Sequence, residues 1–161
     1  MKLAFLSAFG EMGGAERSLY DVLASLRAAR PLWDLSLIVP SAGALYTDVI
    51  RERWRRPRHR GDLPGATATA EDVNPLCGDR VRLALQVKNG QVEAVRFAGD
   101  SCAICTASAD VVAELATGRS IREAAAIGTE DVLEVLRSDV RPTRMRCVTL
   151  PLTVLAMALA Q

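Results

Sequence analysis

Four cysteines and one aspartate are the side chains of this chain best suited to bind a metal or to transfer sulfur. The cysteines are Cys77, Cys102, Cys105 and Cys147. Asp79 stands two positions after the first of them, in the turn-like stretch NPLCGD at residues 74–79. Thiolates and carboxylates are ligands for zinc and for iron, and a thiolate is also a nucleophile toward another sulfur.

Three of the four thiols are expected at the ends of secondary-structure elements. Cys77 precedes a predicted β-hairpin, because apolar residues alternate over 81–87, Asn89 and Gly90 form a turn, and Val95 and Phe97 continue the pattern. Cys102 lies at the N-terminal end of a helix predicted over residues 103–115, which Gly118 ends. Cys147 comes just before an apolar helix in which Pro151 is tolerable only near the first turn.

The remaining elements are predicted from helical spacing and capping residues. A helical face runs over residues 45–54 and is closed by Pro57. A loop rich in Gly, Pro and Thr follows at residues 61–70. The sequence SIRE (120–123) opens a short helix, and Thr129 caps another helix that extends through Arg137.

Loops at element ends can converge on one edge of a sheet, which would bring the thiols together. A thiolate at a helix N-terminus is stabilised by unpaired amides and the helix dipole, so we expect a low pKa for Cys102. Gly78 lets the backbone turn so that Cys77 and Asp79 face one point. Three sulfurs and one oxygen would form a tetrahedral set suited to zinc or iron.

Two other interpretations of the cysteines stay open at this point. Scattered single cysteines are often small buried hydrophobic residues. Cys102 and Cys105 also form a CxxC pair, which on a helix are neighbours at i and i+3 and could act as a redox dithiol.

Composition indicates a globular domain and gives little support for a nucleic-acid or membrane partner. The 161 residues are half apolar, and the net charge is +1. No window approaches eighteen uncharged apolar residues, and the N-terminus lacks a cleavage-site pattern. We therefore expect a cytoplasmic protein, in which free cysteines serve as ligands or reactive thiols rather than as disulfides.

Three cysteine motifs in order carry a family resemblance. The segments NPLCGDRVRLAL, GDSCAICTASAD and RPTRMRCVTL resemble those of the U-type iron–sulfur cluster assembly scaffold family (SUF/ISC/NIF U-like). The preceding ALYTDVIRERWRRPRHRGDLPGATATAEDV resembles that family's N-terminal helix and loop, so the resemblance covers about residues 44–161. It favours a shared site over scattered buried cysteines.

The resemblance implies an α+β fold, with a small, mostly antiparallel sheet and helices packed on one face. It also implies sulfur acceptance from a cysteine desulfurase, and transient assembly of a [2Fe–2S] cluster that passes to acceptor apo-proteins. A SUF branch of the family instead holds Zn2+ and serves as sulfur acceptor. By resemblance Cys77, Asp79, Cys102 and Cys147 are the ligands, with Cys77, or alternatively Cys147, accepting the persulfide sulfur. A scaffold or sulfur acceptor is favoured over a true enzyme.

The chain departs from both branches of the family. The zinc branch usually has an insertion between the second and third cysteines, whereas the separation here is 147 − 102 = 45 positions. The ISC branch has His before the third cysteine and an LPPVK motif, and here Arg146 takes the His position within RPTRMR. The missing motif argues against a dedicated Hsp70 chaperone, and Arg144 with Arg146 is closer to the SUF branch.

Three smaller features have alternative explanations. Cys105 replaces a residue that is usually Ser in the family, and a small residue in a tight helix contact is favoured over a spare thiol near the metal. The basic run at residues 51–60 is favoured as a solvated or desulfurase-docking face over a nucleic-acid site. His59, the single histidine, is expected at the surface.

Residues 1–40 form a separate segment with a βαβ pattern. An apolar run at 2–9, a GEMGG loop, a helical face and a second apolar run at 35–40 resemble the start of a GT4-type glycosyltransferase, a partial Rossmann-like fragment. Forty residues cannot catalyse glycosyl transfer. Such a unit would pack on the scaffold domain, stay partly disordered, or reflect a gene fusion or misjoined reading frame; an accidental or degenerate junction is favoured.

Overall fold

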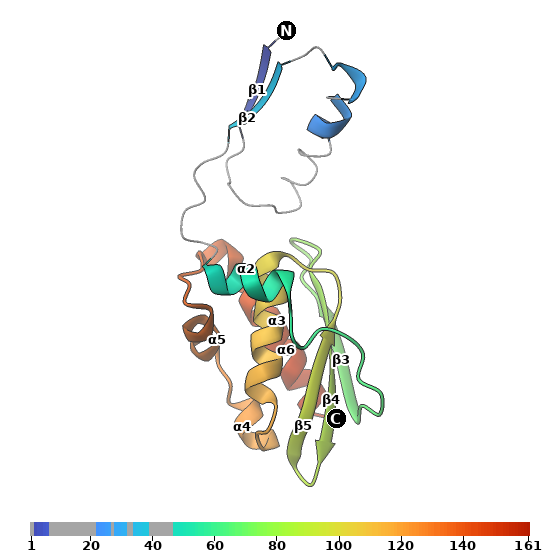
Figure 1. The fold of residues 1–161 in the computed structure, drawn as a ribbon. Coiled ribbons are helices and arrows are strands. Elements are labelled where there is room, and N and C mark those ends of the chain that lie inside the picture. The colour runs from blue at the N-terminus through green and yellow to red at the C-terminus, as the bar shows by residue number, and fades with distance from the viewer. Residues whose placement is uncertain (1, 7–21, 27, 32–33, 39–46) are drawn as a thin grey trace. The chain divides into compact units, whose positions relative to one another are not determined.

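The structure is a computed structural model that divides the chain into two compact units, residues 1–44 and residues 45–161. Figure 1 shows the fold of each unit. The described residues are 2–6, 22–26, 28–31, 34–38 and 47–161. No helix among them is both long and apolar enough to cross a membrane.

The described part of the first unit contains a pair of parallel strands. Strand β1 (Lys2–Leu6) pairs with β2 (Asp34–Ile38), and helical residues 22–26 lie between them in the chain. The two apolar runs therefore pair in parallel, as the sequence predicts. The GEMGG loop and the end of the second run lie outside the described residues, so the resemblance to a glycosyltransferase stays a prediction.

The second unit consists of one three-stranded antiparallel sheet and helices on one of its faces. The strands are β3 (Ala68–Val73), β4 (Arg80–Lys88) and β5 (Gln91–Ala98), in the spatial order β3-β4-β5. The helices are α2 (Asp48–Arg55), α3 (Ala103–Ala116), α4 (Ile121–Ala125), α5 (Thr129–Leu136) and α6 (Met145–Leu159), the last preceded by a 3-10 turn η1 (Pro142–Arg144). Helix α3 packs on β5, and α6 packs on β3 and β4 (Figure 1). The expected α+β fold is confirmed.

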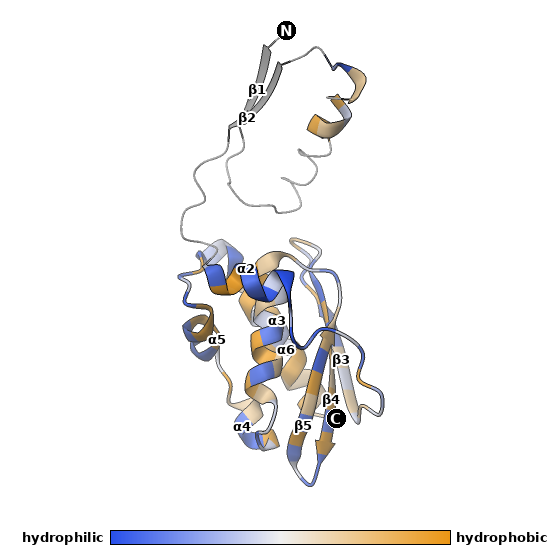
Figure 2. Ribbon diagram, viewed as in Figure 1, coloured by the Kyte–Doolittle hydropathy of each residue, from blue (hydrophilic) through white to orange (hydrophobic). Residues whose placement is uncertain are grey.

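The hairpin β4-β5 follows from alternating hydrophobicity and a two-residue turn. Val81, Leu83 and Leu85 are buried while their neighbours face outward, and orange and blue residues alternate along these strands in Figure 2. Asn89 and Gly90 both have positive φ, 53° and 76°, as in a type I′ turn, so the turn predicted for this pair is present. The buried face of the hairpin forms the side of the hydrophobic core on which α3 and α6 pack.

Helix α3 is the central helix of the core, and its small residues explain how it fits there. Twelve of its residues are buried, and most of them are Ala, Ser, Thr, Cys or Val. Small side chains let neighbouring elements approach the helix closely on several sides. Helices α2, α5 and α6 all contact it.

Three boundaries differ from the sequence prediction. Strand β3 occupies Ala68–Val73, part of which was expected to be loop, because its inward residues are small and give no strong alternation. Helix α6 already begins at Met145, so Pro151 lies in its interior rather than near its first turn. Gly128, not Thr129, is the N-cap of α5.

Candidate metal centre

A tight turn between β3 and β4 positions Cys77 and Asp79. The N–H of Asn74 donates to the carbonyl of Asp79 at 2.8 Å, and the N–H of Gly78 donates to the carbonyl of Asn74 at 2.8 Å. Gly78 has φ +75°, a conformation that glycine adopts without strain, as the sequence predicts for this turn. The turn exposes Cys77 and buries Asp79, which is 5% exposed.

Cys102 is the N-cap of α3 and is tied to Asp79. Its Sγ accepts a hydrogen bond from the N–H of Cys105 at 3.5 Å, and its own N–H donates to Oδ1 of Asp79 at 2.7 Å. The first of these bonds satisfies an amide at the helix N-terminus, as a capping side chain does. The position expected for Cys102 at a helix start is therefore confirmed.

Gly99 allows the segment before Cys102 to lie directly against β4. A Cβ atom at this position would overlap the carbonyl oxygen of Arg80, and φ is +129°. The N–H of Arg80 donates to the carbonyl of Asp100 at 2.8 Å. Because Arg80 follows Asp79 directly, this close approach sets the distance between the Cys-Gly-Asp turn and the start of α3.

Cys147 reaches the same point from the first turn of α6, rather than from before that helix as the sequence suggested. It is 2% exposed, and ligand atoms of Cys77, Asp79 and Cys147 all lie within 4.8 Å of one another. Cys102 lies beside this group, because its sulfur interacts with the Cys147 thiol and its N–H donates to Asp79, but its sulfur does not lie within 4.8 Å of all three of the other ligand atoms. The structure thus groups three of the four nominated residues and places Cys102 beside them, and their role as ligands stays a prediction.

The carboxylate of Asp79 has one oxygen without a partner. Oδ1 accepts the hydrogen bond from Cys102, whereas Oδ2 is buried and has no hydrogen-bond partner among the described residues. Leaving a buried acceptor unpaired costs about 1–3 kcal/mol. A coordinated cation would supply the missing interaction, and thiols with one carboxylate oxygen suit zinc or iron. The residues present therefore fit a metal ion or an iron–sulfur cluster.

The three thiols of this centre differ in pKa. A hydrogen bond from the Cys147 thiol lowers the pKa of Cys102, and the same bond, together with burial, raises the pKa of Cys147. Burial raises the pKa of Cys77, with a further contribution from the neighbouring carboxylate of Asp79. The low pKa expected for Cys102 is present, but its main cause is Cys147 rather than the helix N-terminus.

The match to a family model covers the whole unit that contains this centre. The model, described as the NifU-like N-terminal domain, matches residues 45–161. The chain belongs to this family. The resemblance to the U-type iron–sulfur cluster assembly scaffolds that the three cysteine motifs indicated is thereby confirmed.

Several curated relatives of this NifU-like domain are proteins of iron–sulfur cluster assembly or sulfur transfer. The chain is 29% identical over 115 residues to the scaffold protein IscU 1 of Archaeoglobus fulgidus, covering 71% of this chain and 74% of that protein. It is 36% identical over 114 residues to the bifunctional protein NifU/MnmA of Rubrobacter xylanophilus, covering 70% of this chain but 23% of that protein. It is 35% identical over 80 residues to the zinc-dependent sulfurtransferase SufU of Bacillus subtilis, covering 50% of this chain and 54% of that protein.

A solved structure of a NifU-like relative supports the same fold. A candidate SUF-system scaffold from Fervidobacterium islandicum superposes with a TM-score of 0.63 at 25% identity, covering 71% of this chain and 96% of that one. The small antiparallel sheet with helices on one face is therefore shared with a member of the SUF branch.

Cys105 and the two arginines before Cys147 lie around the NifU-like centre. Cys105 is fully buried in α3, and burial, with the nearby charge of Asp79, raises the pKa of its thiol. Arg144 is half-buried at the N-terminus of α6, and Arg146 is exposed beside Cys147. All four cysteines are free thiols.

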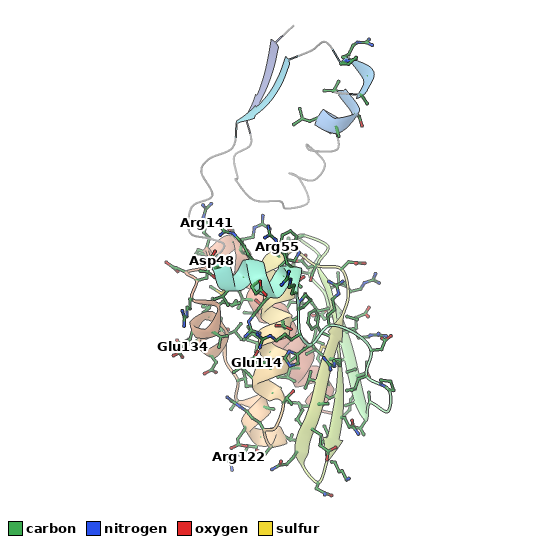
Figure 3. The ribbon with its side chains drawn as sticks, viewed as in Figure 1. Asp48, Arg55, Glu114, Arg122, Glu134 and Arg141 are labelled. Atoms are coloured by element: carbon green, nitrogen blue, oxygen red, sulfur yellow. The ribbon has the colours of Figure 1, made fainter. Side chains whose placement is uncertain are left out.

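A second polar cluster, centred on Asp110, was missed by the sequence analysis. Asp110 is fully buried in α3, where Oδ2 accepts from Nη1 of Arg53 at 2.7 Å and Oδ1 accepts from the backbone N–H of His59 at 2.8 Å. Arg53 also pairs with Glu114 at 2.8 Å (Glu114 is labelled in Figure 3). The prediction that His59 is a surface residue is wrong, because it is half-buried against Asp110.

This cluster is structural rather than a second metal centre. His59, Asp110 and Glu114 have ligand atoms within 4.8 Å of one another, but Arg53 already forms ion pairs with both carboxylates. The cluster attaches α2 and the loop after it to α3. An apolar run in α3 that contains an Asp, preceded by an Arg-rich helix, was the available signal for it.

Proposed function

We propose that this chain accepts sulfur from a cysteine desulfurase and assembles or relays an iron–sulfur cluster. The proposed ligands are Cys77, Asp79, Cys102 and Cys147. The observation that carries the proposal is the buried, unpartnered Oδ2 of Asp79, a residue whose carboxylate lies close to the thiols of Cys77 and Cys147. A buried site with an unmet acceptor is suited to a cation, whereas a purely structural site would have its polar atoms paired.

Cys77 is the proposed sulfur acceptor because it is the exposed thiol of the set. Cys147 is 2% exposed and stays the alternative acceptor once sulfur has entered the site. In the transfer step the Cys77 sulfur attacks the terminal sulfur of the donor persulfide, and a new sulfur–sulfur bond forms. The donor's own sulfur–sulfur bond breaks, its electron pair stays on the donor cysteine, and the Cys77 proton is passed to that leaving thiolate.

The iron–sulfur cluster is the cargo of this reaction, and the chain's own residues hold its components. Cys102 offers the thiol whose pKa is lowered, so it gives up the proton that iron ligation displaces more readily than an ordinary thiol does. Asp79 offers an oxygen ligand, which binds iron less strongly than a thiolate does. A cluster held by three thiols and one oxygen is therefore released more easily than one held by four thiols.

The second candidate is a zinc-dependent SUF-type sulfurtransferase without cluster assembly. Arg146 directly before Cys147, in place of a histidine, and the similarity to the Bacillus subtilis protein favour it. A zinc ion would keep the ligand thiols ionised at neutral pH. The 45-position separation of the second and third cysteines favours the cluster-assembling scaffold.

The proposed partners follow from these two functions. They are a cysteine desulfurase, which supplies sulfur, and acceptor apo-proteins, which receive the product in the cytoplasm. No nucleic-acid or membrane partner is proposed. Residues 1–40 are assigned no function, and a glycosyltransferase fragment remains a remote alternative for them.

Reconstitution tests the proposal and separates its two candidates. Anaerobically purified protein is incubated with a cysteine desulfurase, L-cysteine and ferrous iron, and visible absorption, iron and acid-labile sulfide are measured. A scaffold gives a labile chromophore that Cys77→Ser, Cys102→Ser and Cys147→Ser each abolish, while Cys105→Ala, the matched control, keeps it. Tight zinc with a persulfide on Cys77 and no chromophore identifies the sulfurtransferase. A protein that binds no metal and carries no persulfide after this incubation would contradict the proposal.

A further inference from the structure

Leu76 is a large apolar residue fully presented to solvent directly beside Cys77. Its exposed fraction is 88%, whereas the other exposed large hydrophobic residues of the described chain are 36% to 51% exposed, with Trp54, Val73 and Met157 at 43%, 43% and 46%. Single exposed leucines are ordinary on protein surfaces. The position of this one, adjacent to the proposed sulfur acceptor, calls for a different explanation.

Hydrogen bonds hold Leu76 in this outward position. Its N–H donates to Oδ1 of Asn74 at 3.2 Å. Two residues later, the N–H of Gly78 donates to the carbonyl of Asn74 at 2.8 Å. Asn74 itself is 2% exposed and thus fixed in the domain. The turn therefore presents the leucine side chain on a preorganised backbone, which lowers the entropy lost on docking.

Any protein that delivers sulfur to Cys77 must cover Leu76. A sulfur–sulfur bond is about 2 Å long, and neighbouring Cα atoms are about 3.8 Å apart, so a donor surface that reaches the Cys77 sulfur also meets residue 76. Cys77 is exposed at the same turn, and Val73, 43% exposed, enters the turn from β3. Charged residues Glu71 and Arg80 are exposed on the flanking strands, which leaves the leucine as an apolar centre with a polar rim.

We propose that Leu76 is an anchor that docks into an apolar pocket next to the persulfide-bearing cysteine of the sulfur donor. This inference rests on the proposed function and assigns the donor, a cysteine desulfurase, as the single occupant of this surface. Burial of Leu76 holds the Cys77 sulfur opposite the donor persulfide during the exchange. The bonds made and broken are those of the transfer step described above, so docking adds no further reactant.

Steady-state sulfur transfer tests this role. Persulfide on Cys77 is quantified by mass spectrometry while the concentration of this protein is varied against a cysteine desulfurase with L-cysteine. For Leu76→Ala we expect the KM for the acceptor protein to rise about tenfold, with the rate at saturation within twofold of the unaltered protein, because a docking contact is lost. Leu76→Asp raises KM further, and Met157→Ala, a matched exposed hydrophobic residue in α6, changes it less than twofold.

Two controls separate docking from damage to the site. Zinc affinity and the alkylation rate of Cys77 by iodoacetamide stay within twofold in Leu76→Ala if only docking is lost. An unchanged KM in Leu76→Ala overturns the inference. So does sedimentation that shows a dimer of the unaltered chain and a monomer of Leu76→Ala, because a second copy would then cover the leucine. If the unaltered protein receives no persulfide on any cysteine, the proposed function itself fails.

Discussion

Asp79 gives its two carboxylate oxygens different environments: Oδ1 accepts a hydrogen bond from the N–H of Cys102 at 2.7 Å, and Oδ2 is buried with no partner. The first contact ties the Cys-Gly-Asp turn to the start of α3. The second leaves an unmet acceptor where the thiols of Cys77 and Cys147 approach. The metal-free site is therefore assembled at a cost in stability that a cation would remove.

Asp79→Asn tests the unpartnered oxygen. The amide keeps an acceptor for Cys102 and replaces the unpaired carboxylate oxygen. We therefore expect the free energy of unfolding of the metal-free variant to equal that of the unaltered protein or to exceed it by up to about 1 kcal/mol. Zinc should stabilise the variant less than it stabilises the unaltered protein. Urea unfolding with and without zinc measures both effects.

Asp100→Asn is the control for this comparison, because its carboxylate is 91% exposed near Arg80. It should change neither the urea midpoint nor the response to zinc. A metal-free Asp79→Asn protein that loses several kcal/mol would show that Oδ2 has a structural partner.

Cys147→Ala should raise the pKa of Cys102. The Cys147 thiol donates the hydrogen bond that chiefly lowers the Cys102 pKa, so its removal destabilises the Cys102 thiolate. In chelator-treated protein, the pH at which Cys102 becomes half-maximally reactive toward iodoacetamide should therefore move upward. Peptide mass spectrometry identifies the alkylated residue.

The backbone N–H that Cys105 donates to Cys102 survives in Cys105→Ala, so that variant should leave the reactivity profile of Cys102 unchanged. A profile that stays in place or moves to lower pH in Cys147→Ala would mean that the helix N-terminus, not Cys147, sets this pKa.

Gly99→Ala should destabilise the domain by more than about 2 kcal/mol, because the added Cβ overlaps the carbonyl oxygen of Arg80 and φ is strongly positive. Gly118→Ala is the matched control, since its φ is also positive at +84° but no atom lies within 4 Å of the added Cβ. It should lose about 1 kcal/mol. Thermal unfolding compares them, and equal losses would show that the close approach to Arg80 is unimportant.

Asp110→Ala should cost about 3–5 kcal/mol, because it leaves Arg53 and the amide of His59 without their buried partner. Arg51→Ala breaks an exposed pair with Asp48, labelled in Figure 3, and should change stability by less than about 0.5 kcal/mol. Chemical denaturation distinguishes them. A small loss in Asp110→Ala would mean that solvent reaches this cluster freely.

The sequence predicts the β4-β5 hairpin and the position of Cys102 well, because both depend on local signals. Alternating hydrophobicity and the Asn89-Gly90 pair specify the hairpin. The polar residues Asp100 and Ser101, followed by a helix of small residues, specify Cys102 as the N-cap of α3. Strand β3 is missed because its core-facing residues are small alanines, and its pairing with β4 is decided by tertiary contacts.

The sequence nominates Cys77, Asp79 and Cys147, which the structure groups within 4.8 Å, but it does not reveal the electrostatics of the site. The cysteine motifs nominate the residues that the structure brings together. The interaction of the Cys102 and Cys147 thiols joins residues 45 positions apart, and Asp110 accepts from Arg53 across 57 positions. Such long-range contacts leave no periodic trace in the sequence, so the cause of the Cys102 pKa and the role of His59 required the structure.

X-ray absorption at the zinc edge of the zinc-loaded protein tests the central claim most directly, because it counts the ligand atoms of the centre. The account predicts three sulfur neighbours at about 2.3 Å and one oxygen at about 2.0–2.2 Å, with the oxygen lost in Asp79→Ala and one sulfur lost in Cys102→Ser. A shell of nitrogen and oxygen alone, or a sulfur count unchanged in Cys102→Ser, would contradict it.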